Sequence, residues 1–170
     1  MCSLLSKEFN FVHLSAGELL RDAVKKNDEN AEMLNRLMKE GIIVPPHITI
    51  GLLKKEIRYY LQNSNRTTFL VDGFPRNIEQ GYMFEDEVKP CDFVLFLHAE
   101  DEQLLERLRS RADNEYRVDD NEESFRKRFR TYKETGYPAI ENYGKMGKVK
   151  KVDMDSTVKE NYKKLRQIFL

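Results

Sequence analysis

The chain has 170 residues, of which 40% are hydrophobic and 34% are charged. A length of this order is typical of one domain whose core is large enough to fold without disulfides. Lysine plus arginine and aspartate plus glutamate each total 29, so the formal net charge is zero. This balance provides no field of one sign that would attract nucleic acid or an anionic membrane. Any basic site must therefore be local.

The sequence carries no signal for export or membrane insertion. No apolar run approaches the roughly 20 residues that span a bilayer, and the first eight residues lack the pattern of a secretory signal. Cys2 and Cys91 are far apart and fit no metal-binding spacing, so we expect free thiols in a reducing compartment and no metal ligands. We therefore expect a cytoplasmic protein, and a nuclear location is the alternative.

Four runs of β-branched and aromatic residues predict strands, at residues 11–14, 68–71, 93–97 and 149–152. The second and third runs are almost continuously apolar, which is typical of strands covered on both faces in a parallel sheet. Helical periodicity fills the intervals between the runs. The alternation of strands and helices predicts an α/β fold in which a parallel sheet lies between helical layers.

The helical signals are local as well as periodic. Apolar residues with helical spacing occur at 34–38, 50–61, 104–108, 125–132 and 158–169. Gly41 is expected to end the first of these helices and Pro46 to open the second. Thr157 and Glu160 have the spacing of a capping box at the start of the last helix.

We expect residues 1–170 to form a single domain with two smaller inserts. Residues 22–62 are wholly helical and lie between the first two predicted strands. Residues 112–120 are polar and turn-like, and they lie between two predicted helices. No internal repeat or low-complexity segment interrupts the chain.

Residues 72–76, with the sequence Asp-Gly-Phe-Pro-Arg, carry the clearest chemical signal. They follow a predicted buried strand, and ligands of open α/β sheets bind beyond the carboxyl ends of strands. Gly73 lets the backbone approach a ligand closely, and Arg76 offers a planar fork that suits a phosphate. The alternative is a tight turn with Arg76 in a surface ion pair, and the spacing alone leaves both open.

Residues 14–21 again lead from a strand into a helix, with Ser15 as a plausible N-cap and Arg21 about two turns further on. The alternative is an exposed Arg21 paired with Glu18.

A run of arginines follows later, at Arg107, Arg109, Arg111, Arg117, Arg126, Arg128 and Arg130. Composition favours a solvated helix face for this run, but arginines that flank a polar turn also suit a lid that closes over a polyphosphate.

Taken in order, these motifs resemble the nucleoside monophosphate kinases of the UMP-CMP kinase type, which are similar to adenylate kinases. The matching segments are residues 14–21, 41–45, 71–77 and 117–121, followed by Arg128. The resemblance covers nearly the whole chain. It implies a three-layer α/β/α fold with a parallel sheet and a short lid at residues 112–120. It also implies a monomeric transferase that moves the γ-phosphoryl group of ATP to UMP or CMP, with AMP as a third candidate, in pyrimidine biosynthesis.

The resemblance implies a set of acceptor-binding residues: Arg21, Ile42, Ile43, Val44, Gly73, Phe74, Pro75, Arg76, Gln80, Arg117 and Arg128. Arg21 and Arg76 would hold the phosphate of the acceptor, and the three residues after Gly41 would line its base and ribose. Gln80 would recognise the base through its amide.

The resemblance also implies the residues of the transfer step, which are Asp72, Arg76, Arg117 and Arg128. Asp72 would order Mg²⁺ through water, while the two later arginines would bridge both nucleotides as the lid closes. Arg111 and Ser156 would lie near the adenine of ATP.

The sequence departs from the family at its start. The family begins with a strand and a glycine-rich phosphate loop that carries a lysine, whereas no glycine precedes Gly17 and Lys7 has no glycine beside it. Residues 1–5 look like the helix that follows this loop, so a gap is expected mid-sheet, where unpaired buried groups cost on the order of 1–3 kcal/mol each. Ala112 and Tyr116 replace frequent lid glycines.

Three interpretations remain. The sequence is part of a longer enzyme, or a natural short form that binds monophosphate without transferring phosphate, or a chain whose sheet another segment or chain completes. For the chain as written, we expect negligible kinase activity and retained monophosphate binding.

Overall fold

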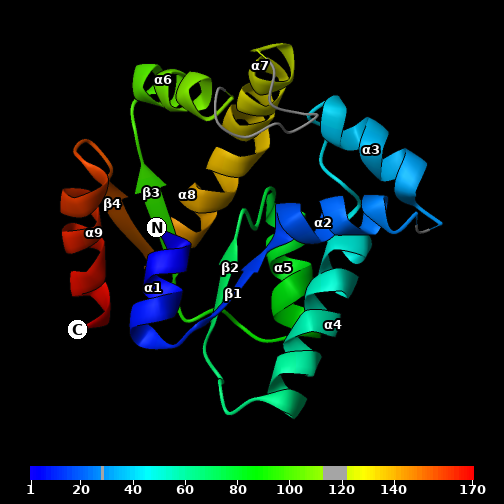
Figure 1. Cartoon of the computed structure of the whole chain (residues 1–170), viewed down its shortest axis with the longest axis horizontal. Helices are drawn as coiled ribbons and strands as arrows, with labels where there is room; N and C mark the ends of the chain where they lie inside the picture. Colours follow the sequence, from blue (N-terminus) through cyan, green and yellow to red (C-terminus); the bar gives the residue numbers. More distant parts are fainter. Residues whose placement is uncertain (28, 113–121) are drawn as a thin grey trace.

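A computed structural model describes residues 1–27, 29–112 and 122–170, including their side chains except at 108–112 and 122. The elements are α1 (Cys2–Phe9), β1 (Val12–Ser15), α2 (Ala16–Lys25), α3 (Ala31–Lys39), α4 (Pro46–Asn63), β2 (Phe69–Asp72), α5 (Ile78–Glu87), β3 (Val94–His98), α6 (Asp101–Ala112), α7 (Glu122–Thr131), the π-helix η1 (Tyr132–Gly136), α8 (Tyr137–Lys145), β4 (Val149–Asp153), α9 (Val158–Arg166) and the 3₁₀-helix η2 (Gln167–Phe169). Figure 1 shows their arrangement. None of the described helices is long and apolar enough to cross a membrane.

The predicted helix ends have clear local causes. The Ser15 hydroxyl accepts a hydrogen bond from the Glu18 amide at 3.4 Å, which caps α2. Pro46 occupies the first turn of α4, where its missing N–H leaves no hydrogen bond unmade. Thr157 and Glu160 form the expected capping box at the start of α9. These three predictions are confirmed.

Two helices, α5 and α8, were not predicted. The Asn77 side chain caps α5 by accepting from the Gln80 amide at 2.8 Å, but the apolar residues of α5 follow no clean helical spacing. At α8, Gly136 and Pro138 resemble helix breakers. Pro138 instead lies in the first turn of the helix, where proline is tolerated.

The four strands lie within one residue of their predicted positions, and they form two separate parallel pairs. β1 pairs with β2, with Ser15 opposite Asp72. β3 pairs with β4, with Val94 opposite Val149. Among the described residues, no strand pairs with the other edge of β2 or of β3. The α/β fold with parallel strands is confirmed, and the expected gap divides the sheet in two.

Helices cover the strands from both sides (Figure 1). On one face, Val12 and Leu14 of β1 pack against Leu53 and Ile57 of α4. On the other face, Leu5 of α1 belongs to a core cluster that also includes Val152 of β4, Met154 of the following loop and Leu165 of α9. Leu70 of β2 and Leu95 and Leu97 of β3 pack against this same cluster. The helix α1 therefore joins the two strand pairs on one face, although the strands do not pair with each other.

The apolar strands β2 and β3 were expected to be buried on both faces, and this expectation is wrong. Every residue of β3 is only partly buried, as are the first three residues of β2. The reason is the open edge of each strand, because a strand without a neighbour exposes one side of its backbone and side chains. All five residues of β3 line a cavity of about 630 Å³.

Candidate functional site

The site begins where β1 and β2 end together. The pairing of Ser15 with Asp72 places the start of α2 beside residues 72–76. Gly73 has a φ of 70°, in the left-handed region that favours glycine. The Nε of Arg76 donates to the Gly73 carbonyl at 3.0 Å, which folds the arginine back over the turn. The Phe74–Pro75 peptide is cis.

Arg21 and Arg76 come together over Gly17. A Cβ built on Gly17 would lie 3.3 Å from Nη1 of Arg21 and 3.6 Å from Nη2 of Arg76. Because two guanidinium groups repel each other, bringing them this close creates a strong local site for an anion. A phosphate accepts from several N–H groups at once, which suits this arrangement.

Gln80 supports the turn at residues 72–76 through its side-chain amide. Its side chain is nearly inaccessible, with a residue exposure of 2%. Its Oε1 accepts from the Arg76 backbone N–H at 2.9 Å, and its Nε2 donates to the Val44 carbonyl at 3.4 Å. Gln80 therefore connects the turn after β2 to the segment before α4. One N–H and one oxygen lone pair of the amide remain for other partners, so base recognition by Gln80 stays a prediction.

A small recess brings many of the predicted residues together. It is lined by Ala16, Gly17, Leu20, Arg21, Met38, Gly41, Ile42, Val44, Thr49, Gly73, Arg76, Gln80 and Arg128. Thr49 was not predicted. It lies in α4 with 4% of its surface exposed, and among the described residues its hydroxyl has no hydrogen-bond partner. A threonine on an otherwise apolar helix face was the signal that could have identified it.

Arg128 reaches the recess because α7 packs closely against the turn after α3. The hydroxyl of Thr131 donates to the Gly41 carbonyl at 2.8 Å, and that of Ser124 donates to the Lys39 carbonyl at 3.1 Å. Gly41 has a φ of 66°, and a Cβ there would lie 2.8 Å from the backbone nitrogen of Arg128. Glycine at this position therefore permits both the turn and the close approach of α7.

The predicted apolar residues differ in accessibility. Ile42 is 54% exposed, whereas Val44 is buried. Ile43 and Pro75 line the large cavity. Phe74 also lines it, but its ring packs against Phe84 with the centroids 5.2 Å apart. Stacking of Phe74 on a base stays a prediction.

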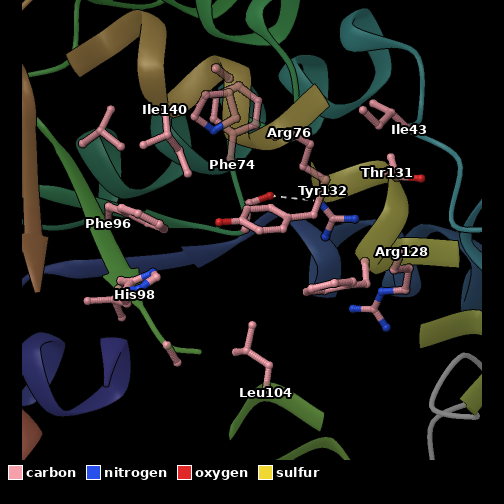
Figure 2. Close-up of a pocket in the computed structure, with 18 of the residues that line it drawn as sticks. Ile43, Phe74, Arg76, Phe96, His98, Leu104, Arg128, Thr131, Tyr132 and Ile140 are labelled. Carbon is pink, nitrogen blue, oxygen red and sulfur yellow. Dashed lines mark hydrogen bonds between the residues drawn. The ribbon is translucent and has the colours of Figure 1, made fainter. Parts of the chain in front are cut away.

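The large cavity extends from the recess to the open edge of β3. Figure 2 shows Arg76 and Arg128 on one side, and Phe96 and His98 of β3 on the other, with Tyr132 between them. The walls are mostly apolar, apart from the arginines and a histidine. The site thus has a basic end near β2 and an apolar end beside the unpaired strand.

Asp72 lies beside two residues that were not predicted to join it. Its Oδ2 is 3.4 Å from Nε2 of His13. Cys2, at the start of α1, lies beside this pair. Its sulfur, a ring nitrogen of His13 and a carboxylate oxygen of Asp72 all lie within 4.8 Å of one another. Burial, followed by the charge of Asp72, raises the pKa of the Cys2 thiol to about 11.

Ser156 lies outside both cavities, in the loop between β4 and α9. Its hydroxyl donates to the Glu160 carboxylate. Asn161, buried in α9, accepts from the Ser156 amide at 3.2 Å and donates to the Ser156 carbonyl at 2.7 Å. The backbone of this loop is therefore held in place. Contact between Ser156 and a nucleotide stays a prediction.

The side chains of Arg111 and Arg117, and residues 113–120 of the predicted lid, lie outside the described part of the chain. Their roles stay predictions. Arg107, in α6, donates to the Met154 carbonyl, so it connects α6 to the loop after β4.

With this geometry established, comparisons with known proteins identify the family. The model of the adenylate kinase family matches residues 1–148. The chain belongs to the adenylate kinase family. It is 42% identical over 170 residues to UMP-CMP kinase 3 of Oryza sativa subsp. japonica, covering 99% of this chain and 78% of the rice protein.

Two further relatives of this adenylate kinase family member have similar names. The chain is 41% identical over 163 residues to uridylate kinase of Saccharomyces cerevisiae, covering 95% of this chain and 79% of the yeast protein. It is 42% identical over 173 residues to the human UMP-CMP kinase, covering 99% of this chain and 88% of the human protein. The resemblance to kinases of the UMP-CMP type is therefore confirmed.

Proposed function

We propose that this chain binds a pyrimidine nucleoside monophosphate, UMP or CMP, as the phosphoryl acceptor of a UMP-CMP kinase-type phosphotransferase. The observation that carries the proposal is the convergence of Arg21 and Arg76 on Gly17 at the carboxyl end of the β1–β2 pair. AMP is a third candidate acceptor. The relatives' names support the pyrimidine nucleotides and a place in pyrimidine nucleotide metabolism.

In this proposal, each described residue acts on the acceptor in a definite way. Arg21 and Arg76 hold its phosphate by charge-assisted hydrogen bonds. Gln80 fixes the backbone of Arg76, which supports an orienting role. Arg128 comes from α7, so movement of α7 would change the charge around the phosphate. The large cavity beside β3 offers the space for the donor nucleotide, ATP.

Mg²⁺ fits one residue of this site. Asp72 is a partly exposed carboxylate at the strand end, and carboxylate and water oxygens are the ligands that Mg²⁺ prefers. When bound, Mg²⁺ neutralises charge on the transferred phosphoryl group. We propose that Asp72 holds the waters of this ion, whereas the Cys2 thiol and His13 imidazole do not suit it. Arg117, proposed to act with Arg128, belongs to the same transfer step.

A second candidate function is monophosphate binding without phosphoryl transfer. The observation in its favour is the break between β2 and β3, which leaves the apolar end of the cavity open where the two strand pairs would meet. Phosphoryl transfer depends on positioning, and a divided sheet positions the two ends of the site less firmly. The basic acceptor end does not depend on that break.

Calorimetry with UMP, CMP and AMP, together with a coupled kinase assay, tests both functions on the 170-residue chain. We expect binding of the pyrimidine monophosphates. Robust turnover would support the phosphotransferase, whereas negligible turnover by a chain that binds them would support the second candidate. Arg76→Ala should weaken binding by about 10- to 100-fold, because a charged hydrogen bond contributes about 1.5–3 kcal/mol. Arg58→Ala, which removes an exposed arginine from α4, is the matched control and should bind normally. Equal loss in both variants, or no binding by folded protein, would reject the acceptor site.

Thr49 provides an independent test of where the acceptor lies. Burying a hydroxyl without a partner costs about 1–3 kcal/mol, and valine has the same shape without the hydroxyl. Thr49→Val should therefore stabilise the free chain, as measured by urea unfolding. If the acceptor nucleotide supplies the missing partner, the same variant should bind CMP about tenfold more weakly. A variant that is more stable and binds CMP normally would place the nucleotide elsewhere.

A further inference from the structure

Cys2, His13 and Asp72 come from three elements that pack in a fixed way. His13 and Asp72 lie on one face of the β1–β2 pair, because His13 is two residues before Ser15, the pairing partner of Asp72. Their neighbours Val12, Leu14 and Val71 face α4 on the opposite side. The shared face of His13 and Asp72 is the one that α1 covers.

The direction of α1 explains why Cys2 meets the other two residues. After the left-handed turn at Asn10, β1 runs back along α1 (Figure 1). The first residue of the helix, Cys2, therefore comes close to Asp72, the last residue of β2. Leu5 of α1 packs with Leu70 of β2 and fixes the helix on this face. Core packing therefore places the backbone of the three residues.

We propose that Cys2, His13 and Asp72 form a zinc site. A thiolate, an imidazole and a carboxylate are the three donor types that Zn²⁺ takes in proteins, whereas Mg²⁺ takes oxygen donors. Among the described residues, these three form a group of Cys, His and Asp side chains whose donor atoms all lie within 4.8 Å of one another. It supplies three ligands, and a fourth tetrahedral position remains for water or an anion. Zn²⁺ here would take the same Asp72 carboxylate that the proposed function gives to the waters of Mg²⁺, so the two ions would compete for this residue.

The distances require little rearrangement. Around tetrahedral Zn²⁺, ligands at about 2.0–2.3 Å from the metal lie about 3.4–3.7 Å from one another. The His13–Asp72 distance is already 3.4 Å, and the widest separation in the group exceeds this spacing by only about 1 Å. The side chains of His13 and Asp72 are 22% and 47% exposed, so they have room to adjust. The cation would also replace the proton that the Cys2 thiol otherwise keeps.

Cobalt spectroscopy tests the site without nucleotide, so its outcome does not depend on the proposed function. Co²⁺ is added to the reduced, metal-free chain, and a thiolate-to-cobalt charge-transfer band with intense tetrahedral d–d bands is expected. One equivalent of Zn²⁺ per chain should remove these bands, whereas excess Mg²⁺ should leave them. No band from a folded chain, or displacement by Mg²⁺, would overturn the proposal.

Matched variants locate the site. Cys2→Ser should abolish the charge-transfer band, and Cys91→Ser, which removes the other thiol, should retain it. His13→Ala should weaken Co²⁺ binding by at least about tenfold, since outer-shell partners alone contribute 10–100-fold. His98→Ala, which alters a histidine 3.3 Å from Glu100, should leave Co²⁺ binding unchanged. Circular dichroism of each variant reports folding, and a band that follows Cys91 instead of Cys2 would refute the assignment.

Discussion

Gly41→Ala tests whether the packing of α7 positions the proposed acceptor site. Gly41 has a φ of 66°, and a left-handed conformation costs a residue with a Cβ about 1–2 kcal/mol. The new Cβ would also lie 2.8 Å from the backbone nitrogen of Arg128 and 3.1 Å from the carbonyl carbon of Lys127. These are backbone atoms, so α7 itself must move, and overpacking of this kind costs about 1–3 kcal/mol. We expect a total loss of about 2–5 kcal/mol in unfolding free energy.

Two other glycines separate the contributions. Gly147 also has a positive φ, of 68°, but no atom lies within 4 Å of the position that a Cβ would take, so Gly147→Ala should cost only about 1–2 kcal/mol. Gly51 lies in α4 with ordinary helical backbone and open space around it. Gly51→Ala should stabilise the chain by about 0.5–1 kcal/mol through helix propensity.

The assay is urea unfolding of the three variants and the parent chain, followed by circular dichroism. Calorimetry with CMP is then performed on each folded protein. Gly41→Ala should also weaken CMP binding, because Arg128 moves with α7, whereas Gly147→Ala should not. If Gly41→Ala loses no more stability than Gly147→Ala, then α7 does not pack against Gly41 as described and the placement of Arg128 is wrong.

Three further predictions concern the carboxyl-terminal helix. Asn161→Ala should lower unfolding free energy by about 2–3 kcal/mol, because it leaves both main-chain groups of Ser156 without their partner; a loss below about 1 kcal/mol in urea would argue against this network. Thr157→Ala should cost about 1 kcal/mol by removing the cap of α9, and an unchanged urea midpoint would contradict it. The hydrogen bond from Tyr162 lowers the pKa of Glu8. Its stabilising effect is thus present above the ordinary glutamate pKa and lost as pH falls through the lowered one. Glu8→Gln should flatten the stability profile in that range, and parallel profiles would refute the assignment.

Local sequence signals predicted much of the fold. The apolar run of β3 and the spacing of Thr157 and Glu160 are patterns among residues close in the sequence. The strand and the helix cap that they form could therefore be inferred without the structure. The helix α8 was missed because Pro138 has opposite meanings in the first turn and in the middle of a helix. The effect of Pro138 can be inferred only when the residue at which the helix begins is known.

The site was predicted through its charged residues, and its supporting contacts were not. Arg76 was recognisable from the turn chemistry around it. The unpartnered hydroxyl of Thr49 depends on packing between α4 and the segment before it, which no local spacing encodes. The proximity of Cys2 to Asp72 likewise arises from a helix folding back over a strand pair, so residues far apart in the sequence become neighbours.

The open edges of β2 and β3 have a consequence for handling the protein in concentrated solution. An unpaired, apolar edge strand is a template on which another extended chain can form a ladder of hydrogen bonds. The described part of the chain presents two such edges, and both strands carry almost no charge to discourage pairing. Self-association through added strands, and ultimately aggregation, should therefore rise with concentration unless the gap is filled.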